Sequence, residues 1–160
     1  MVLGQIQEKM FKNKILTTKG EIINYGKINI VAGSAGILLA SIGGMMLGLT
    51  YNDFFKDGSY MIDLSRAFLK AAHTHGQPLA MYNLIFALLI NQVVLTDRSR
   101  KIASWAAVLS LVMPVGMVLR GLTDGAMTFA PVAMIGVLGF FVSAGFLLAG
   151  CTGMNENRKA

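Results

Sequence analysis

The sequence predicts an all-α protein, a bundle of four transmembrane helices that forms a single integral membrane domain over residues 1–160. Two observations support this fold class. Hydrophobic residues make up 54% of the chain and charged residues only 14%, whereas a soluble domain carries about 25% charged residues. The charged residues also lie outside four apolar runs, 28–50, 77–95, 102–119 and 129–150. This distribution excludes a water-soluble enzyme and a disordered chain.

Each run is close to the roughly 20 residues that a helix needs to cross the hydrocarbon core of a bilayer. None of the runs alternates polar and apolar residues, so helices are favoured over barrel strands. The first run, 28–50, follows a long polar and charged stretch and is expected to be a retained span, not a signal peptide.

The second helix is expected over 63–95, because Asp63 or Ser65 can cap its start and good helix formers follow. The third and fourth helices are expected over 102–119 and 129–150. Pro114 and Pro131 are expected to bend or to start helices, because proline lacks a backbone donor.

Lysine and arginine residues predict the orientation. Ten of them lie in the segment before the first run, in the loop after the second run and in the C-terminal tail. The opposite side of the membrane receives four, which are Lys56, Arg66, Lys70 and Arg120. The positive-inside rule therefore predicts a multi-pass protein of the inner (cytoplasmic) membrane with both termini in the cytoplasm. Nucleic acid is not an expected partner, because the basic residues flank apolar runs and form no soluble patch.

Glycines are frequent within the first and fourth runs, and small residues let membrane helices approach closely. Four helices alone leave little interior. We therefore expect a homo-oligomer with sites between the subunits.

Both histidines of the chain, His73 and His75, lie in the segment 70–78 near the outer membrane boundary. At about 100° per residue, His73 shares a helix face with Arg66, Lys70 and Gln77, while His75 points nearly the opposite way. One metal is therefore expected on one of the two histidines, not on both.

A different sequence feature favours each histidine as the heme ligand. His73 has Arg66 two turns and Lys70 one turn outward, where heme propionates would meet cations. His75 is followed by Gly76, whose missing side chain lets a planar macrocycle approach. Alternatively, a histidine at this depth is hydrated by water or forms a hydrogen bond to a neighbouring helix.

Copper is an alternative metal because the chain has eleven methionines, whose thioether sulfur can bind it. Zinc is not expected, because carboxylate or thiolate ligands are lacking nearby.

Tyr82 and Asn83 lie about two turns below His75 and are candidate catalytic residues, since a phenol and an amide there could orient the oxygen of a ligand. Hydrogen bonding between helices is the alternative role for both.

The segment Lys70-Ala71-Ala72-His73-Thr74-His75-Gly76-Gln77-Pro78 resembles a motif of the styrene oxide isomerase family, small four-helix bacterial membrane enzymes. Members carry Arg-Ala-His followed closely by Gly and Pro at the start of the second membrane helix. The resemblance extends to the short basic loop at 96–100 and to the overall length and topology.

The resemblance implies that the motif histidine is the axial ligand of heme b and that ferric iron acts as a Lewis acid that converts an epoxide to an aldehyde. A small apolar substrate such as an aryl epoxide is implied as well. Alignment on Ala-His favours His73, whereas alignment on Pro78 favours His75. The chain departs from the family in its third helix, where Ser110, Pro114 and Val118 stand in place of Asp, Asn and Tyr.

Two other functions remain open. A b-type cytochrome or an accessory electron-transfer subunit of a respiratory complex would need a second axial ligand, such as a methionine or a histidine of another subunit. A structural or copper-handling membrane protein is the third interpretation.

Overall fold

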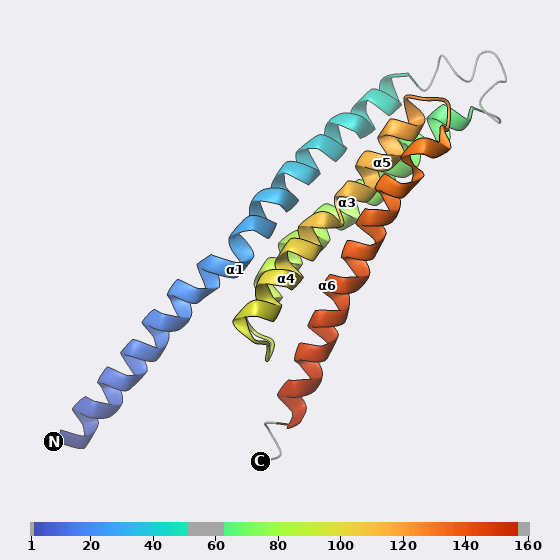
Figure 1. Cartoon of the computed structure of the whole chain (residues 1–160). Coiled ribbons are helices and arrows are strands. Elements are labelled where there is room, and N and C mark those ends of the chain that lie inside the picture. Colours follow the sequence, from blue (N-terminus) through green and yellow to red (C-terminus); the bar gives the residue numbers. More distant parts are fainter. Residues whose placement is uncertain (1, 51–62, 157–160) are drawn as a thin grey trace.

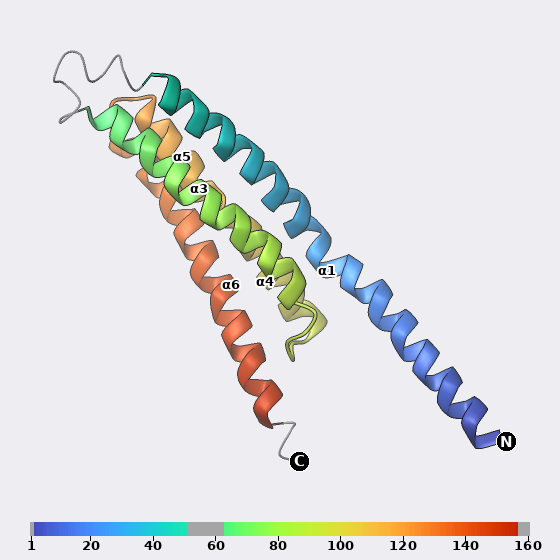
Figure 2. The same ribbon diagram turned by 180° about the vertical axis from the view of Figure 1, so that it is seen from behind.

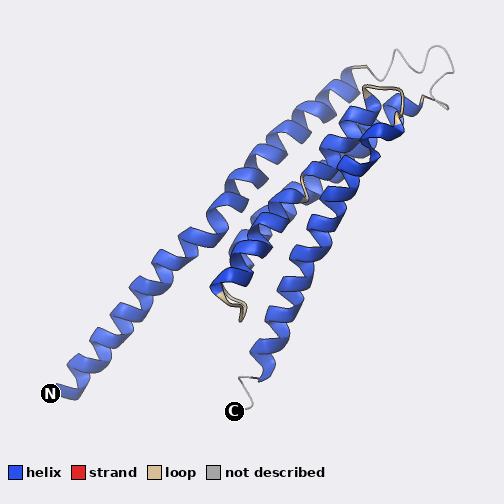
Figure 3. Ribbon diagram, in the orientation of Figure 1, coloured by secondary structure: helices blue, strands red, loops and turns tan. Residues whose placement is uncertain are grey.

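A computed structural model of the chain describes residues 2–50 and 63–156, with side chains for 25–50 and 63–153. The predicted all-α class is confirmed, since the described residues form helices and no strands (Figure 3). The elements are α1 (Val2–Leu49), α3 (Leu64–Leu89), α4 (Asp97–Leu109), α5 (Val112–Gly121), the short 3-10 helix η2 (Met127–Phe129) and α6 (Ala130–Glu156). Lys56, Arg158 and Lys159, used above to predict the orientation, lie outside the described residues.

The helices lie side by side as four long rods, with α4 and α5 stacked end to end in one of them (Figure 1). α3 packs against α1, α4 and α5, and α6 packs against α4 and α5. α1 begins and α6 ends at the same end of the bundle, and α1 extends beyond the other helices there (Figure 2).

Three helical segments are long and apolar enough to cross a membrane, namely Tyr25–Leu49, Asp97–Gly121 and Met127–Gly153. Their length and composition indicate a membrane protein. α3 runs beside these segments for 26 residues, about 39 Å at the usual helical rise. It carries Arg66, Lys70 and both histidines in its first half.

The helix bounds differ from the expected ones where local backbone chemistry overrides the apolar pattern. α1 begins at Val2, far before residue 28, so the helix includes the polar N-terminal segment as well as the apolar run. α3 begins as expected, with the side chain of Asp63 accepting a hydrogen bond of 3.1 Å from the backbone N–H of Arg66. It ends at Leu89 instead of 95, since the Gln92 N–H turns back to the Leu89 carbonyl oxygen at 2.8 Å.

The third expected helix, 102–119, is divided into α4 and α5. Pro114 has no N–H to donate to the Ser110 carbonyl, and its ring crowds that oxygen. The N–H of Met113 donates to Ser110 instead, at 3.2 Å, and the chain continues as α5. α6 starts at Ala130 with Pro131 as its second residue, so the expectation that these prolines bend or start helices is confirmed.

Glycines allow the closest helix contacts, as expected within a subunit. A Cβ added to Gly136 would overlap the backbone of Met113, and one added to Gly116 would overlap that of Ala133, so α5 and α6 meet backbone to backbone. A Cβ on Gly33 would lie 2.7 Å from the Ala80 carbonyl oxygen, which joins α1 to α3 in the same way.

A layer of buried polar side chains crosses the bundle away from the histidines. Asn29 of α1 and Asn83 of α3 are both 0% exposed, and the Asn29 amide donates to Asn83 Oδ1 at 3.1 Å. The same Asn29 nitrogen donates to the Ser104 carbonyl oxygen of α4 at 3.0 Å. Such bonds fix the rotation of three helices relative to one another, because a buried amide without partners is costly.

Candidate functional site

A cavity of about 770 Å³ lies between α1, α3 and α5. Its volume falls within the range of about 300–1,000 Å³ that is usual for small-molecule sites. α1 and α5 both pack on α3, and the cavity lies between them with α3 as its floor. Most of its wall is apolar, and its polar lining residues are Thr50, Asp63, Ser65, Arg66 and His73.

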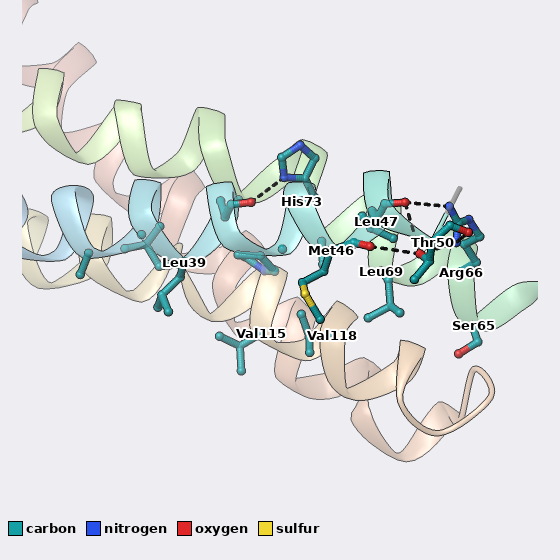
Figure 4. Close-up of a pocket in the computed structure, with 18 of the residues that line it drawn as sticks. Leu39, Met46, Leu47, Thr50, Ser65, Arg66, Leu69, His73, Val115 and Val118 are labelled. Atoms are coloured by element: carbon teal, nitrogen blue, oxygen red, sulfur yellow. Dashed lines mark hydrogen bonds between the residues drawn. The ribbon is translucent and has the colours of Figure 1, made fainter. Parts of the chain in front are cut away.

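His73 is a half-buried residue in the wall of this cavity. Its Nδ1 lies 2.7 Å from the backbone carbonyl oxygen of Ala40 on α1. A carbonyl oxygen only accepts, so Nδ1 donates this bond and Nε2 is the ring nitrogen left to serve as a metal ligand. In Figure 4 the ring lies between α3 and α1, and Val115 and Val118 of α5 lie on the opposite side of α1 in this view.

The His73 ring packs directly against Gly44 of α1. A Cβ at Gly44 would overlap the Cε1 atom of the ring, so only glycine leaves room for the imidazole at this crossing of α1 and α3. Two groups of α1 therefore fix the histidine, the Ala40 carbonyl by a hydrogen bond and Gly44 by contact. Metal-binding histidines usually have their second nitrogen oriented in this way by a carbonyl or carboxylate.

Arg66 stands at the polar end of the cavity and joins α3 to the last turn of α1. Its guanidinium donates to Thr50 Oγ1 at 3.0 Å and to the Leu47 carbonyl oxygen at 2.9 Å (Figure 4). A cation at the C-terminus of a helix also interacts favourably with the helix dipole. Arg66 is thus held in place by α1 while it still lines the cavity.

Gly76 is buried in the floor of the cavity. A Cβ there would lie 3.4 Å from the Ala40 Cβ and 3.6 Å from the Pro114 Cβ, which are ordinary contacts. The space beside Gly76 therefore admits one methyl group but no bulky side chain.

The remaining predicted ligands lie elsewhere. His75 and Lys70 are exposed on α3 and are not among the lining residues. The structure thus brings His73, Arg66 and Gly76 to one cavity and separates His75 and Lys70 from it.

Tyr82 and Asn83 also lie outside the cavity lining. The Tyr82 hydroxyl is 2.8 Å from Ser143 Oγ of α6, and the Asn83 amide donates to the Ala107 carbonyl oxygen of α4 at 2.9 Å. These are hydrogen bonds between helices, the alternative role expected for both residues. A role in orienting a substrate stays a prediction.

The sequence interpretation missed Ala40, Gly44 and Thr50, which position His73 and Arg66. The signal for them is weak, because a backbone carbonyl has no sequence signature and glycine is frequent throughout α1. Only the crossing of α1 over α3 singles these positions out.

Among the described residues, no three histidine, cysteine, aspartate or glutamate side chains gather into a metal site. A heme needs only one protein ligand, and the His73 imidazole, oriented through Nδ1 with Nε2 as the donor, fits that requirement. Comparison of the chain with models of protein families, with curated proteins and with solved structures gives no match.

Proposed function

We propose that this protein is a heme b-binding integral membrane protein that resembles styrene oxide isomerase, with His73 as the axial ligand. The observation that carries the proposal is the hydrogen bond of 2.7 Å from His73 Nδ1 to the Ala40 carbonyl oxygen. This bond orients a half-buried imidazole in the wall of an apolar cavity and leaves Nε2 as a lone-pair donor. The exposed His75 has no such support among the described contacts.

Ferric heme b, when bound, would supply a Lewis acid for the isomerisation of an epoxide to an aldehyde. The chain supplies the other requirements. His73 holds the cofactor, and Arg66 offers a fixed cation for a propionate at the polar end. The apolar side chains Leu39, Val115 and Val118 exclude water and favour a small apolar epoxide.

The test is the visible spectrum of the protein purified in mild detergent after expression with ample heme. We expect a Soret band in the wild type, its loss in His73→Ala, and its retention in the matched variant His75→Ala. The reverse pattern would transfer the ligand role to His75. A colourless wild type that does not take up added hemin would remove heme from the proposal altogether.

The alternative function, a b-type cytochrome, is favoured by one observation, which is that Met46 lines the same cavity as His73. Histidine and methionine together are axial ligands of low-spin hemes. A low-spin spectrum with reversible reduction by a quinol would support electron transfer, and Met46→Leu should then convert the heme to high spin. A high-spin ferric state that resists reduction would support the isomerase.

The same proposal includes assembly and orientation. The described part of α6 leaves large apolar side chains exposed, among them Leu138 and Phe141, which a second copy in a homo-oligomer would cover. A monomeric mass in mild detergent would contradict this. An inner-membrane location with both termini in the cytoplasm follows from the positive-inside rule, and reporter fusions at each terminus test it.

A further inference from the structure

The residues that line the cavity extend over a long stretch of α1. Its lining residues on α1 run from Ala32 to Thr50, a distance of about 27 Å at the helical rise. An extended hydrocarbon chain could lie along a lining of this length.

The polarity of the lining changes along this length. The part from Ala32 to Met46 on α1, with Leu111 and Val115 of α5 facing it, is apolar apart from His73. The end toward Thr50 contains Asp63, Ser65 and Arg66. The cavity therefore matches a molecule with one long apolar tail and one polar head.

The charge of the residues at the polar end of the cavity indicates an anionic head group. Arg66 is the one cationic residue among the lining residues, and α1 holds its guanidinium at this end. The carboxylate of Asp63 accepts from a backbone N–H in the first turn of α3, where the positive end of the helix dipole offsets its charge. The Ser65 hydroxyl donates to the Gly121 carbonyl oxygen. An anionic head thus finds a cation there, and the exposed Lys70 stands one turn further along α3.

From these observations we infer that the cavity between α1, α3 and α5 is a binding site for a long-chain fatty acid. Its carboxylate lies at Arg66 and its chain extends along α1 toward Ala32. The inference concerns binding only and goes beyond the proposed function. It applies to the heme-free protein, because the fatty acid would use the same cavity and the same Arg66 that are proposed above for heme and its propionate, so the two ligands should compete.

Gly43 offers a way to block the cavity without disturbing the packing. It lines the cavity, and a Cβ at this position meets no atom within 4 Å. A leucine at Gly43 therefore projects into the space for the chain. Gly48 provides the matched control, because it lies on the same helix, has equally open space and is not a lining residue.

The experiment measures binding of palmitic acid and of hexadecanol to the full chain in phospholipid nanodiscs. We expect saturable palmitic acid binding in the wild type and in Gly48→Leu, and at least about tenfold weaker binding of both ligands in Gly43→Leu, because the chain loses its apolar contacts. Octanoic acid should bind much more weakly than palmitic acid, since it fills less of the cavity.

The role of Arg66 is tested by Arg66→Gln, which keeps a hydrogen-bond donor and removes the charge. Palmitic acid should bind about tenfold more weakly, as expected for the loss of a charge-assisted hydrogen bond, whereas hexadecanol binding should be unchanged. Retained hexadecanol binding shows that the variant is folded.

Three results would overturn the inference. Unchanged palmitic acid binding in Gly43→Leu would place the ligand elsewhere, and equal affinity for octanoic and palmitic acids would exclude a site of this length. No saturable binding in nanodiscs would mean that phospholipid tails fill the space. The binding samples are expressed without added heme and are checked for the absence of a Soret band, so that palmitic acid binding and the heme spectrum test the two proposals separately.

Discussion

His73 of α3 and Gly44 of α1 are in contact at a crossing that only a residue without a side chain permits. A Cβ at Gly44 would overlap the imidazole, whose Nδ1 bonds to the Ala40 carbonyl oxygen one turn away at 2.7 Å. The orientation of the histidine that is proposed to bind heme is thus determined by two groups of another helix. This relationship makes α1 part of the site although it contributes no ligand.

Gly44→Ala should displace the His73 ring and break its bond to Ala40. We expect a loss of about 0.5–1.5 kcal/mol of stability from this hydrogen bond, together with a shifted or weakened Soret band. Thermal unfolding in detergent and the visible spectrum measure the two effects. Gly48→Ala, on the same helix but with open space at its Cβ, should change neither. Equal behaviour of the two variants would mean that Gly44 does not fix the ring.

Asn29 and Asn83 should be energetically coupled, because they share a buried hydrogen bond of 3.1 Å. Interhelical hydrogen bonds in membrane proteins contribute about 0.6 kcal/mol on average and at most about 2 kcal/mol. A double-mutant cycle of Asn29→Ala and Asn83→Ala, followed by reversible unfolding in detergent, should give a coupling energy in that range. Gln92→Ala serves as the control because Gln92 is exposed, and additive effects of the two asparagine substitutions would contradict the bond.

Gly136→Ala should destabilise the bundle by more than 1 kcal/mol, because its Cβ would overlap the backbone of Met113 and backbone cannot move aside cheaply. Gly145→Ala in the same helix should be neutral or stabilising, since its Cβ meets no atom within 4 Å and alanine favours helix by about 1 kcal/mol over glycine. Unfolding midpoints of the two variants provide the comparison. Similar midpoints would show that α5 and α6 do not meet as closely as described.

Tyr82→Phe separates a structural from a catalytic role of this phenol. The variant loses the hydrogen bond to Ser143 but keeps the ring contact with Phe140, whose centroid lies 5.1 Å away. We expect a cost of about 0.5–1.5 kcal/mol in stability and epoxide turnover close to that of the wild type. A large loss of turnover with unchanged stability would instead assign Tyr82 to the reaction.

The apolar runs and the local chemistry of the backbone determined much of the fold by themselves. Four charge-free runs of membrane-spanning length predict a helical bundle, since a helix satisfies its own hydrogen bonds in lipid. The N-cap at Asp63 and the break ahead of Pro114 follow from residues within a few positions of each effect. Such local features can be predicted because the groups that interact are close in the sequence.

Tertiary structure decided the site. The sequence offered His73 and His75 equally, and only the packing of α3 against α1 made one half-buried in a cavity wall and left the other exposed. Asn29, which bonds to Asn83, and Ser143, which bonds to Tyr82, lie 54 and 61 residues away from them along the chain. Helical periodicity separates the faces of a helix but does not say which neighbour each face meets. That depends on where glycines such as Gly33 and Gly44 let two backbones approach, a property of both helices together.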